Sequence, residues 1–161
     1  MKWLTMENNF DSLLDSIIKL SIEKNLISLS DILGMSNNEI KHIENTFCLK
    51  LPIVYKHFLA VCGNGCGKLL DNSLLDYPPS LLELYEDVRE MMEEDIETIY
   101  DPIPDNAFFF ATTLAIHYWY FICDSNPDPI VYYITLGEKN HLKCSELSRC
   151  IIGTLNNSIK E

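Results

Sequence analysis

The sequence predicts a single α+β domain in which helices flank a mainly antiparallel sheet. Over residues 10–62, apolar side chains recur every three or four positions, which is typical of amphipathic helices. From residue 106 the apolar runs become short, aromatic and β-branched, which favours strands. The sequence contains no internal repeat, and its 161 residues are enough for one domain over 1–161.

Three helices are expected in the first third of the chain. The first covers residues 10–25, where one apolar stripe is continuous. The second begins at a capping box, in which Ser36 accepts from the amide of Glu39 and the Glu39 side chain reaches back. The third begins at Pro52, because proline at the first helical position loses no needed donor. The glycine-rich residues 63–67 end this helix by supplying positive-φ positions.

The rest of the chain is expected to form strands, an acidic helix, a sheet and a closing helix. Residues 68–77 favour one or two short strands, and Ser80 caps a helix over residues 81–101. Ser145 caps the last helix. The sheet strands are expected over residues 107–113, 116–123 and 130–136, the last two forming an antiparallel hairpin through the turn at 124–129.

The middle strand of this sheet is apolar on both sides, because residues 117–121 do not alternate with polar ones. Two arrangements fit such a strand. Either it is central and covered on both faces, or it covers the core with one face and offers the other to a partner.

The negative charge of the chain is concentrated in the acidic helix. Residues 83–101 hold nine acids and one base, which gives −8 of the total −12. Residues 1–82 hold nine acids and seven bases, and residues 102–161 hold six acids and four bases, so each of these segments contributes only −2. A local field of this kind favours a basic partner. The candidate partner-binding residues are Glu83, Glu86, Asp87, Glu90, Glu93, Glu94, Glu97 and Trp119.

The acids of this helix also repel one another. Many of them stand three or four residues apart, and the summed repulsion is on the order of 2–4 kcal/mol before salt screening. A purely structural helix could relieve this repulsion with interspersed lysines. The pattern therefore favours a surface that meets cations, and a merely solvated helix face is the alternative.

Composition argues against several other classes of function. A chain with a net charge of −12 and two arginines is poorly suited to nucleic acid. No apolar run is long enough to span a bilayer, and residues 1–7 lack the apolar core of a signal peptide, so a cytoplasmic protein is expected. Cys48, Cys62, Cys123 and Cys150 stand among apolar residues, so buried thiols are expected rather than disulfides.

Neither a metal site nor an active site is expected. Cys62, Cys66 and His57 are close in sequence, but no second pair follows at a spacing typical of zinc sites. The same cysteines are also candidate nucleophiles, with His57 or His117 as the base. The sequence shows no nucleophile elbow, and the negative charge of the protein disfavours a reactive thiolate. The glycines at 63–67 follow a helix and precede a strand, the reverse of a phosphate loop. We expect a protein that is not an enzyme and has no cofactor.

Short motifs in the first half of the sequence resemble the SUKH superfamily. They are Ser36-Asn37-Asn38-Glu39-Ile40, Ile43-Glu44, Leu51-Pro52, Tyr55-Lys56, Phe58-Leu59 and Asn64-Gly65. The resemblance covers residues 36–155 and leaves 1–35 as an amino-terminal helical extension. Cys66 departs from the pattern, since members usually have paired glycines there. The matching positions are implied to determine the fold and not to catalyse: Glu39, Ile40, Pro52, Tyr55, Phe58, Leu59, Asn64 and Gly65.

The resemblance implies a non-enzymatic domain that binds other proteins. Bacterial members are commonly immunity proteins that neutralise toxins by direct binding, and many of these toxins are nucleases. A basic toxin domain would complement the acidic helix. The alternative is a regulatory or scaffold domain with an endogenous protein partner.

Overall fold

The computed structural model describes residues 2–71 and 81–160. Its helices are α1 (Lys2–Glu23), the 3-10 helix η1 (Leu29–Asp31), α2 (Asn37–Phe47), α3 (Ile53–Cys62), α4 (Lys68–Asp71), α5 (Leu81–Glu94) and α6 (Leu147–Lys160). Its strands are β1 (Ile32–Leu33), β2 (Gly65–Cys66), β3 (Ala107–Thr113), β4 (His117–Ile122), β5 (Ile130–Thr135) and β6 (Leu142–Glu146). Within the described ranges, no helix is both long and apolar enough to cross a membrane.

The main sheet is antiparallel throughout and has the strand order β3-β4-β5-β6. A small second sheet pairs β1 with β2. The α+β class is thus confirmed, and so is the hairpin between β4 and β5. β4 is an interior strand, and both of its faces are covered: Phe121 and Tyr120 are 0% and 3% exposed on opposite sides. This is the first of the two arrangements that its apolar sequence allowed.

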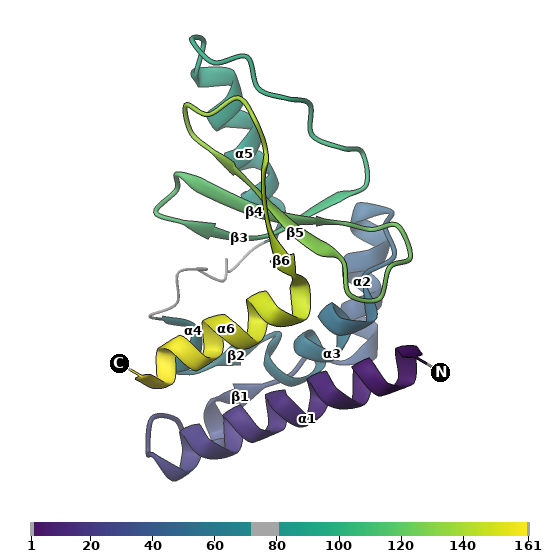
Figure 1. The fold of residues 1–161 in the computed structure, drawn as a ribbon, viewed down its shortest axis with the longest axis vertical. Coiled ribbons are helices and arrows are strands. Elements are labelled where there is room, and N and C mark those ends of the chain that lie inside the picture. Colours follow the sequence, from purple (N-terminus) through teal and green to yellow (C-terminus); the bar gives the residue numbers. More distant parts are fainter. Residues whose placement is uncertain (1, 72–80, 161) are drawn as a thin grey trace.

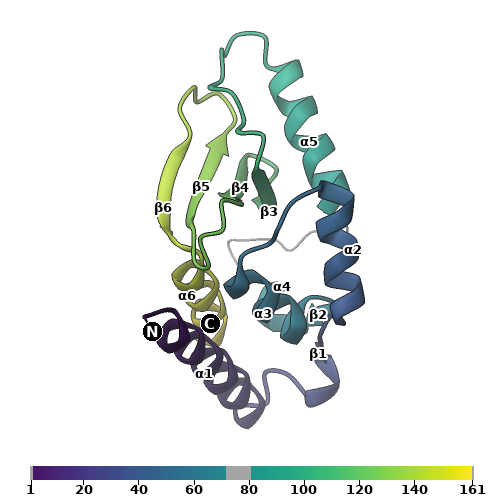
Figure 2. The same ribbon diagram turned by 90° about the vertical axis from the view of Figure 1, so that its right-hand side faces the viewer.

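Helices cover the two faces of the sheet unequally (Figures 1 and 2). On one face, α1, α3 and α6 pack together and form a large core with the sheet. On the other face, α5 packs across β3 and forms a smaller core, against which Tyr100 and Ile103 of the following loop also pack. The smaller core consists of Leu84, Val88, Met91, Ala107, Phe109, Tyr118, Tyr120 and Ile134. α5 is therefore a layer of its own on this face, held by these apolar contacts and by Tyr85, whose ring centroid lies 5.0 Å from that of Phe47 on α2.

The residues of the family motifs build the contacts around α2 and α3. The side chains of Ile40, Tyr55, Phe58 and Leu59 are at most 5% exposed and belong to the large core. Pro52 lies at the N-cap position of α3, one residue before the helix, and not at its first residue as predicted.

The capping box at the start of α2 is confirmed, and it does more than cap the helix. The amide and the hydroxyl of Ser36 donate to a Glu39 oxygen at 2.7 and 2.8 Å. Asn64 donates to the other Glu39 oxygen at 3.2 Å and to the carbonyl of Gly34 at 3.1 Å. Glu39 thus joins the start of α2 to the turn after α3. The hydrogen bonds that Glu39 accepts lower its pKa, and the one from the Ser36 amide has the largest effect.

Glu39→Gln is expected to reduce the pH dependence of stability. A carboxyl whose pKa is lowered in the folded state stabilises the fold above its unfolded value of 4.5, and this contribution is lost as pH falls through the folded value. The variant lacks that contribution, so its free energy of unfolding is expected to be lower at neutral pH and to fall less below pH 4.5. Urea unfolding across this pH range measures both effects. The exposed Glu23→Gln is the control, and an equal change in both variants would contradict the role of Glu39.

The glycine-rich turn after α3 differs in part from the prediction. Gly63 is helical, with φ −63°, whereas Gly65 and Gly67 have positive φ values of 152° and 53°. A Cβ at Gly67 would stand 3.0 Å from atoms of both Ile27 and Asp31. Glycine is required there by backbone conformation and by close packing.

The sequence predicts strands over residues 68–77. The prediction is wrong for residues 68–71, which form helix α4, and residues 72–77 lie outside the described residues. Leu69 is 1% exposed in the large core, and its carbonyl accepts from the Ser158 hydroxyl of α6 at 2.8 Å. Packing against α6 therefore decides the conformation of this short segment. The predicted cap of α5, Ser80, also lies outside the described residues.

The last helix begins differently from the prediction. Ser145 lies in β6, an edge strand whose polar sequence gave no strand signal. The cap comes instead from the β4–β5 turn, where Asp128 accepts from the amide and the hydroxyl of Ser148 at 2.8 and 2.6 Å. Asp128 is 8% exposed and stands 20 positions from Ser148 in the sequence. A cap so distant cannot be recognised from local sequence.

Candidate protein-binding surface

The acidic residues of α5 are exposed because the helix buries its opposite side. Leu84, Val88 and Met91 face the sheet. The remaining positions of the helix therefore point away from the core. The carboxylates of α5 that are exposed to solvent are Glu83, Glu86, Asp87, Glu90, Glu93 and Glu94.

The helix ends at Glu94, seven residues before the predicted end at Asp101. The Asp95 side chain accepts from the amides of Glu97 and Thr98 at 3.3 and 3.2 Å, which replaces helical hydrogen bonds with a turn. Residues 96–100 also include three β-branched residues, which are weak helix formers. Glu97 is therefore exposed in a loop, and its predicted repulsion with acids of the helix does not apply.

The loop after α5 is fastened to the β5–β6 turn. The Tyr100 hydroxyl donates to Asp95 at 2.5 Å and accepts from the amide of Gly137 at 2.9 Å. The amide of Asp101 donates to the carbonyl of Lys139 at 3.0 Å. The hydrogen bond from Tyr100 is the main cause that lowers the pKa of Asp95. The end of α5 is thus fixed against the end of the sheet.

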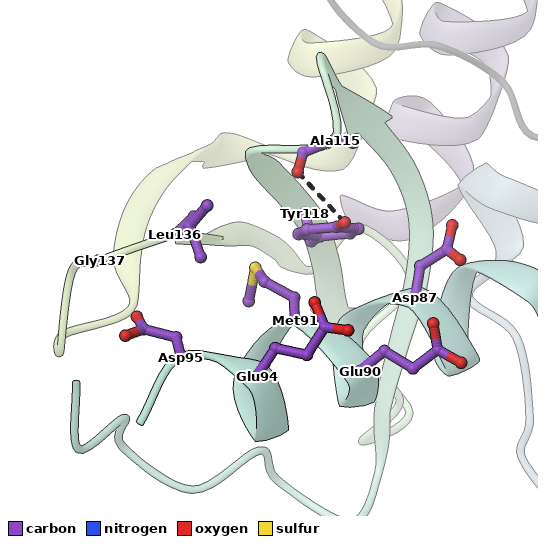
Figure 3. A pocket seen from close by; sticks show the side chains of 9 residues that line it. All are labelled: Asp87, Glu90, Met91, Glu94, Asp95, Ala115, Tyr118, Leu136 and Gly137. Carbon is purple, nitrogen blue, oxygen red and sulfur yellow. Dashed lines mark hydrogen bonds between the residues drawn. The ribbon is translucent and has the colours of Figure 1, made fainter. Parts of the chain in front are cut away.

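An open hollow of about 660 Å³ lies between α5, the β3–β4 turn and the β5–β6 turn (Figure 3). We call it the acidic hollow, and it is lined by Asp87, Glu90, Met91, Glu94, Asp95, Ala115, Tyr118, Leu136 and Gly137. Its floor is apolar, since Met91 and Tyr118 are 8% and 4% exposed. Burial, followed by the charge of Asp87, raises the pKa of Tyr118. The phenol stays protonated at neutral pH and donates to the carbonyl of Ala115 at 3.3 Å.

Among the described residues, no ion pair joins a carboxylate of the hollow to a lysine, an arginine or a histidine. The ion pairs formed between the described residues lie away from the hollow, and their acidic members are Glu44, Asp11 and Glu146. None of the pairs joins Glu86, Glu90 or Glu94 to a lysine or arginine. The arrangement can attract a positively charged group from another molecule.

The β3–β4 turn beside the hollow has an unusual backbone. It is closed by a hydrogen bond from the amide of Ile116 to the carbonyl of Thr113, 3.1 Å long. Its two central residues, Leu114 and Ala115, have φ values of 56° and 52°. Such turns are usually made by Asn-Gly, because the left-handed conformation costs other residues roughly 1–2 kcal/mol each. Leu114 is nevertheless 76% exposed, so core packing does not explain its presence.

Further large apolar residues, which were not predicted from the sequence, are exposed in the loop and the turns that carry lining residues of the hollow. Ile96 and Ile99 are 90% and 82% exposed in the loop after α5, and Leu136 is 45% exposed in the β5–β6 turn. The one available signal was Leu114, a large apolar residue between two expected strands, whereas Leu136 stood inside an expected strand. The predicted extension of the acidic helix to Asp101 hid two of these residues.

Trp119 does not join this surface. It lies on the face of β4 opposite α5, packs against the large core and is partly buried. Its ring centroid lies 4.5 Å from that of Tyr133, and its indole N–H donates to the Thr113 hydroxyl at 3.2 Å. The structure thus brings the carboxylates of α5 together but separates them from the tryptophan.

The residues considered for metal binding or catalysis are engaged in other contacts. The Cys62 and Cys66 sulfur atoms are 2.9 Å apart and buried, while His57 contacts Asp11 at 2.7 Å and His117 contacts the Thr135 hydroxyl at 2.9 Å. The hydrogen bond with Cys66 and burial raise the pKa of Cys62. In the part of the chain described, no three His, Cys, Asp or Glu side chains form a group that could hold a metal ion.

Comparison with known proteins gives a family assignment. Residues 34–148 match the model of the family described as SMI1 / KNR4 family (SUKH-1). Comparison with curated proteins and with solved structures gave no match. The match spans more than half of the chain and includes the capping box, α3 and the whole of β3, β4 and β5. The chain therefore belongs to the SMI1/KNR4 family (SUKH-1).

Proposed function

We propose that this chain is a non-enzymatic, cytoplasmic protein-binding domain, and that it acts as an immunity protein that neutralises a cognate toxin by direct binding. The observation that carries the proposal is the exposed acidic side of α5. No lysine or arginine pairs with Glu86, Glu90 or Glu94 among the described residues, so their charge is available to a basic partner. Membership of the family supports a protein-binding role.

A toxin with nuclease activity suits this surface. A nuclease must present a basic groove to the phosphates of its substrate. Carboxylates fixed on a helix can occupy such a groove and compete with nucleic acid. The charges mainly accelerate the encounter, while apolar contacts supply most of the affinity.

Co-expression tests the proposal. Cells that carry the toxin encoded beside this gene are expected to survive when they also express this chain, and the toxin is expected to co-purify with it. A chain with Phe108→Ala and Phe121→Ala together, which removes two stacked rings from the large core, is the control for protection that needs the folded protein. Protection without a complex would contradict direct binding. Lack of protection, with an endogenous protein recovered in a stoichiometric complex, would instead support the scaffold alternative.

A further inference from the structure

We propose that the chain binds its partner at the turn end of the sheet, through apolar residues of the segments that line the acidic hollow. Four residues of this turn-end surface, Asp87, Glu90, Glu94 and Asp95, line the hollow, as does Leu136. Its other apolar residues are Leu114, next to the lining residue Ala115, and Ile96 and Ile99, in the loop that follows Asp95; all three are exposed. Its occupant is a segment of a partner protein that carries apolar side chains next to lysine or arginine. The inference deepens the proposed function and rests on it only for the identity of the partner.

The segments that carry the apolar residues of this surface are held in place. Figure 1 shows the end of α5, the β3–β4 turn and the β5–β6 turn at the same side of the molecule. The loop that carries Ile96 and Ile99 is fastened to the β5–β6 turn through Tyr100. Exposed apolar residues on a fixed frame bind with little loss of conformational freedom.

The turn that holds Leu114 indicates that this residue is retained for a purpose other than stability. A left-handed conformation at Leu114 and Ala115 opposes the local preferences of both residues. Leu114 is 76% exposed, so it gains little from burial within its own fold. Local conflicts of this kind are expected mainly at functional sites.

Charge decides which partner fits. Asp87, Glu90 and Glu94 line the same hollow as Leu136, so an apolar segment that docks here also meets carboxylates. A segment with lysine or arginine complements them, and an acidic segment is repelled. A symmetric dimer of this chain would place two acidic hollows against each other, which disfavours a second copy as the occupant. Glu86 and Glu93, which do not line the hollow, then contribute to the long-range field and not to direct contacts.

The test uses a double variant that is expected to fold better and to bind worse. Leu114→Asn with Ala115→Gly gives the turn its preferred residues, so the melting temperature is expected to rise by a few degrees. The probe is a short amphipathic leucine–lysine peptide, and the double variant is expected to bind it about tenfold more weakly. Leu29→Asn is the matched control, because Leu29 is also 76% exposed but lies in η1. This control is expected to change the affinity by less than about twofold.

Amide chemical shifts locate the peptide independently. Changes in amide chemical shift that centre on Ala115, Leu136 and Gly137 when the leucine–lysine peptide is added, and that a leucine–glutamate peptide does not cause, would support the turn-end surface. Shifts centred elsewhere, or equal affinity in the double variant, would overturn it. A dimer of the wild-type chain that the double variant loses would overturn it in favour of self-association. This experiment needs no toxin, so its failure is distinct from a failure of co-expression to protect cells.

Discussion

Exchanging Glu86, Glu90, Glu93 and Glu94 for glutamine is expected to slow association with a basic partner by about 10- to 100-fold at low ionic strength. These four carboxylates are exposed on α5, and none has a lysine or arginine paired with it in the described part of the chain. Glutamine is nearly as good a helix former as glutamate, and the change removes repulsion within the helix. The variant is therefore expected to fold at least as well as the wild type.

Stopped-flow mixing with the purified toxin domain measures the effect. The difference between variant and wild type is expected to shrink as salt rises, since the screening length falls from about 30 Å at 0.01 M to about 10 Å at 0.1 M. A variant with Asp15→Asn, Glu23→Gln, Asp105→Asn and Asp124→Asn has the same net charge but keeps the acids of α5. If both variants slowed association equally, total charge rather than the α5 surface would set the rate.

The positions of β3, β4 and β5 could be predicted from the sequence because each is a largely apolar run, whereas the polar β6 gave no such signal. Residues 107–113 form β3 as expected, and 130–136 differ from β5 by one residue. The capping box of α2 was equally visible, since Ser36 and Glu39 interact with each other and depend on no distant residue. Local chemistry was sufficient for these elements.

Elements fixed by distant contacts could not be predicted in the same way. The placement of the loop after α5 depends on the hydrogen bond from the Gly137 amide to Tyr100, and the start of α6 depends on Asp128. The candidate site shows the same division. Its carboxylates were evident from charge alone, whereas the hollow exists only because the β3–β4 and β5–β6 turns lie beside α5.

Phe109→Ala is expected to lower the free energy of unfolding by about 3–5 kcal/mol and to weaken the attachment of α5. Phe109 is 0% exposed in the small core that holds this helix. Its ring centroid lies 5.3 Å from that of Tyr85 on α5 and 5.1 Å from that of Tyr120 on β4. Tyr85 also donates to the carbonyl of Ala107, and burial raises its pKa to about 12, so this donor persists at physiological pH. Urea unfolding measures the loss, and Leu29→Ala is an exposed control expected to change stability by less than about 0.5 kcal/mol.

Phe121→Ala distinguishes loss of α5 from loss of the whole fold. Phe121 is also 0% exposed, but it packs against Tyr55, Phe108 and Phe110 in the large core on the other face of the sheet. Both variants are expected to lose similar stability. Only Phe109→Ala is expected to speed hydrogen exchange in α5 beyond that in α3, because α5 is a separate layer. Equal acceleration in both variants would show that α5 opens only with the rest of the domain, and the acidic surface would then be as stable as the core beneath it.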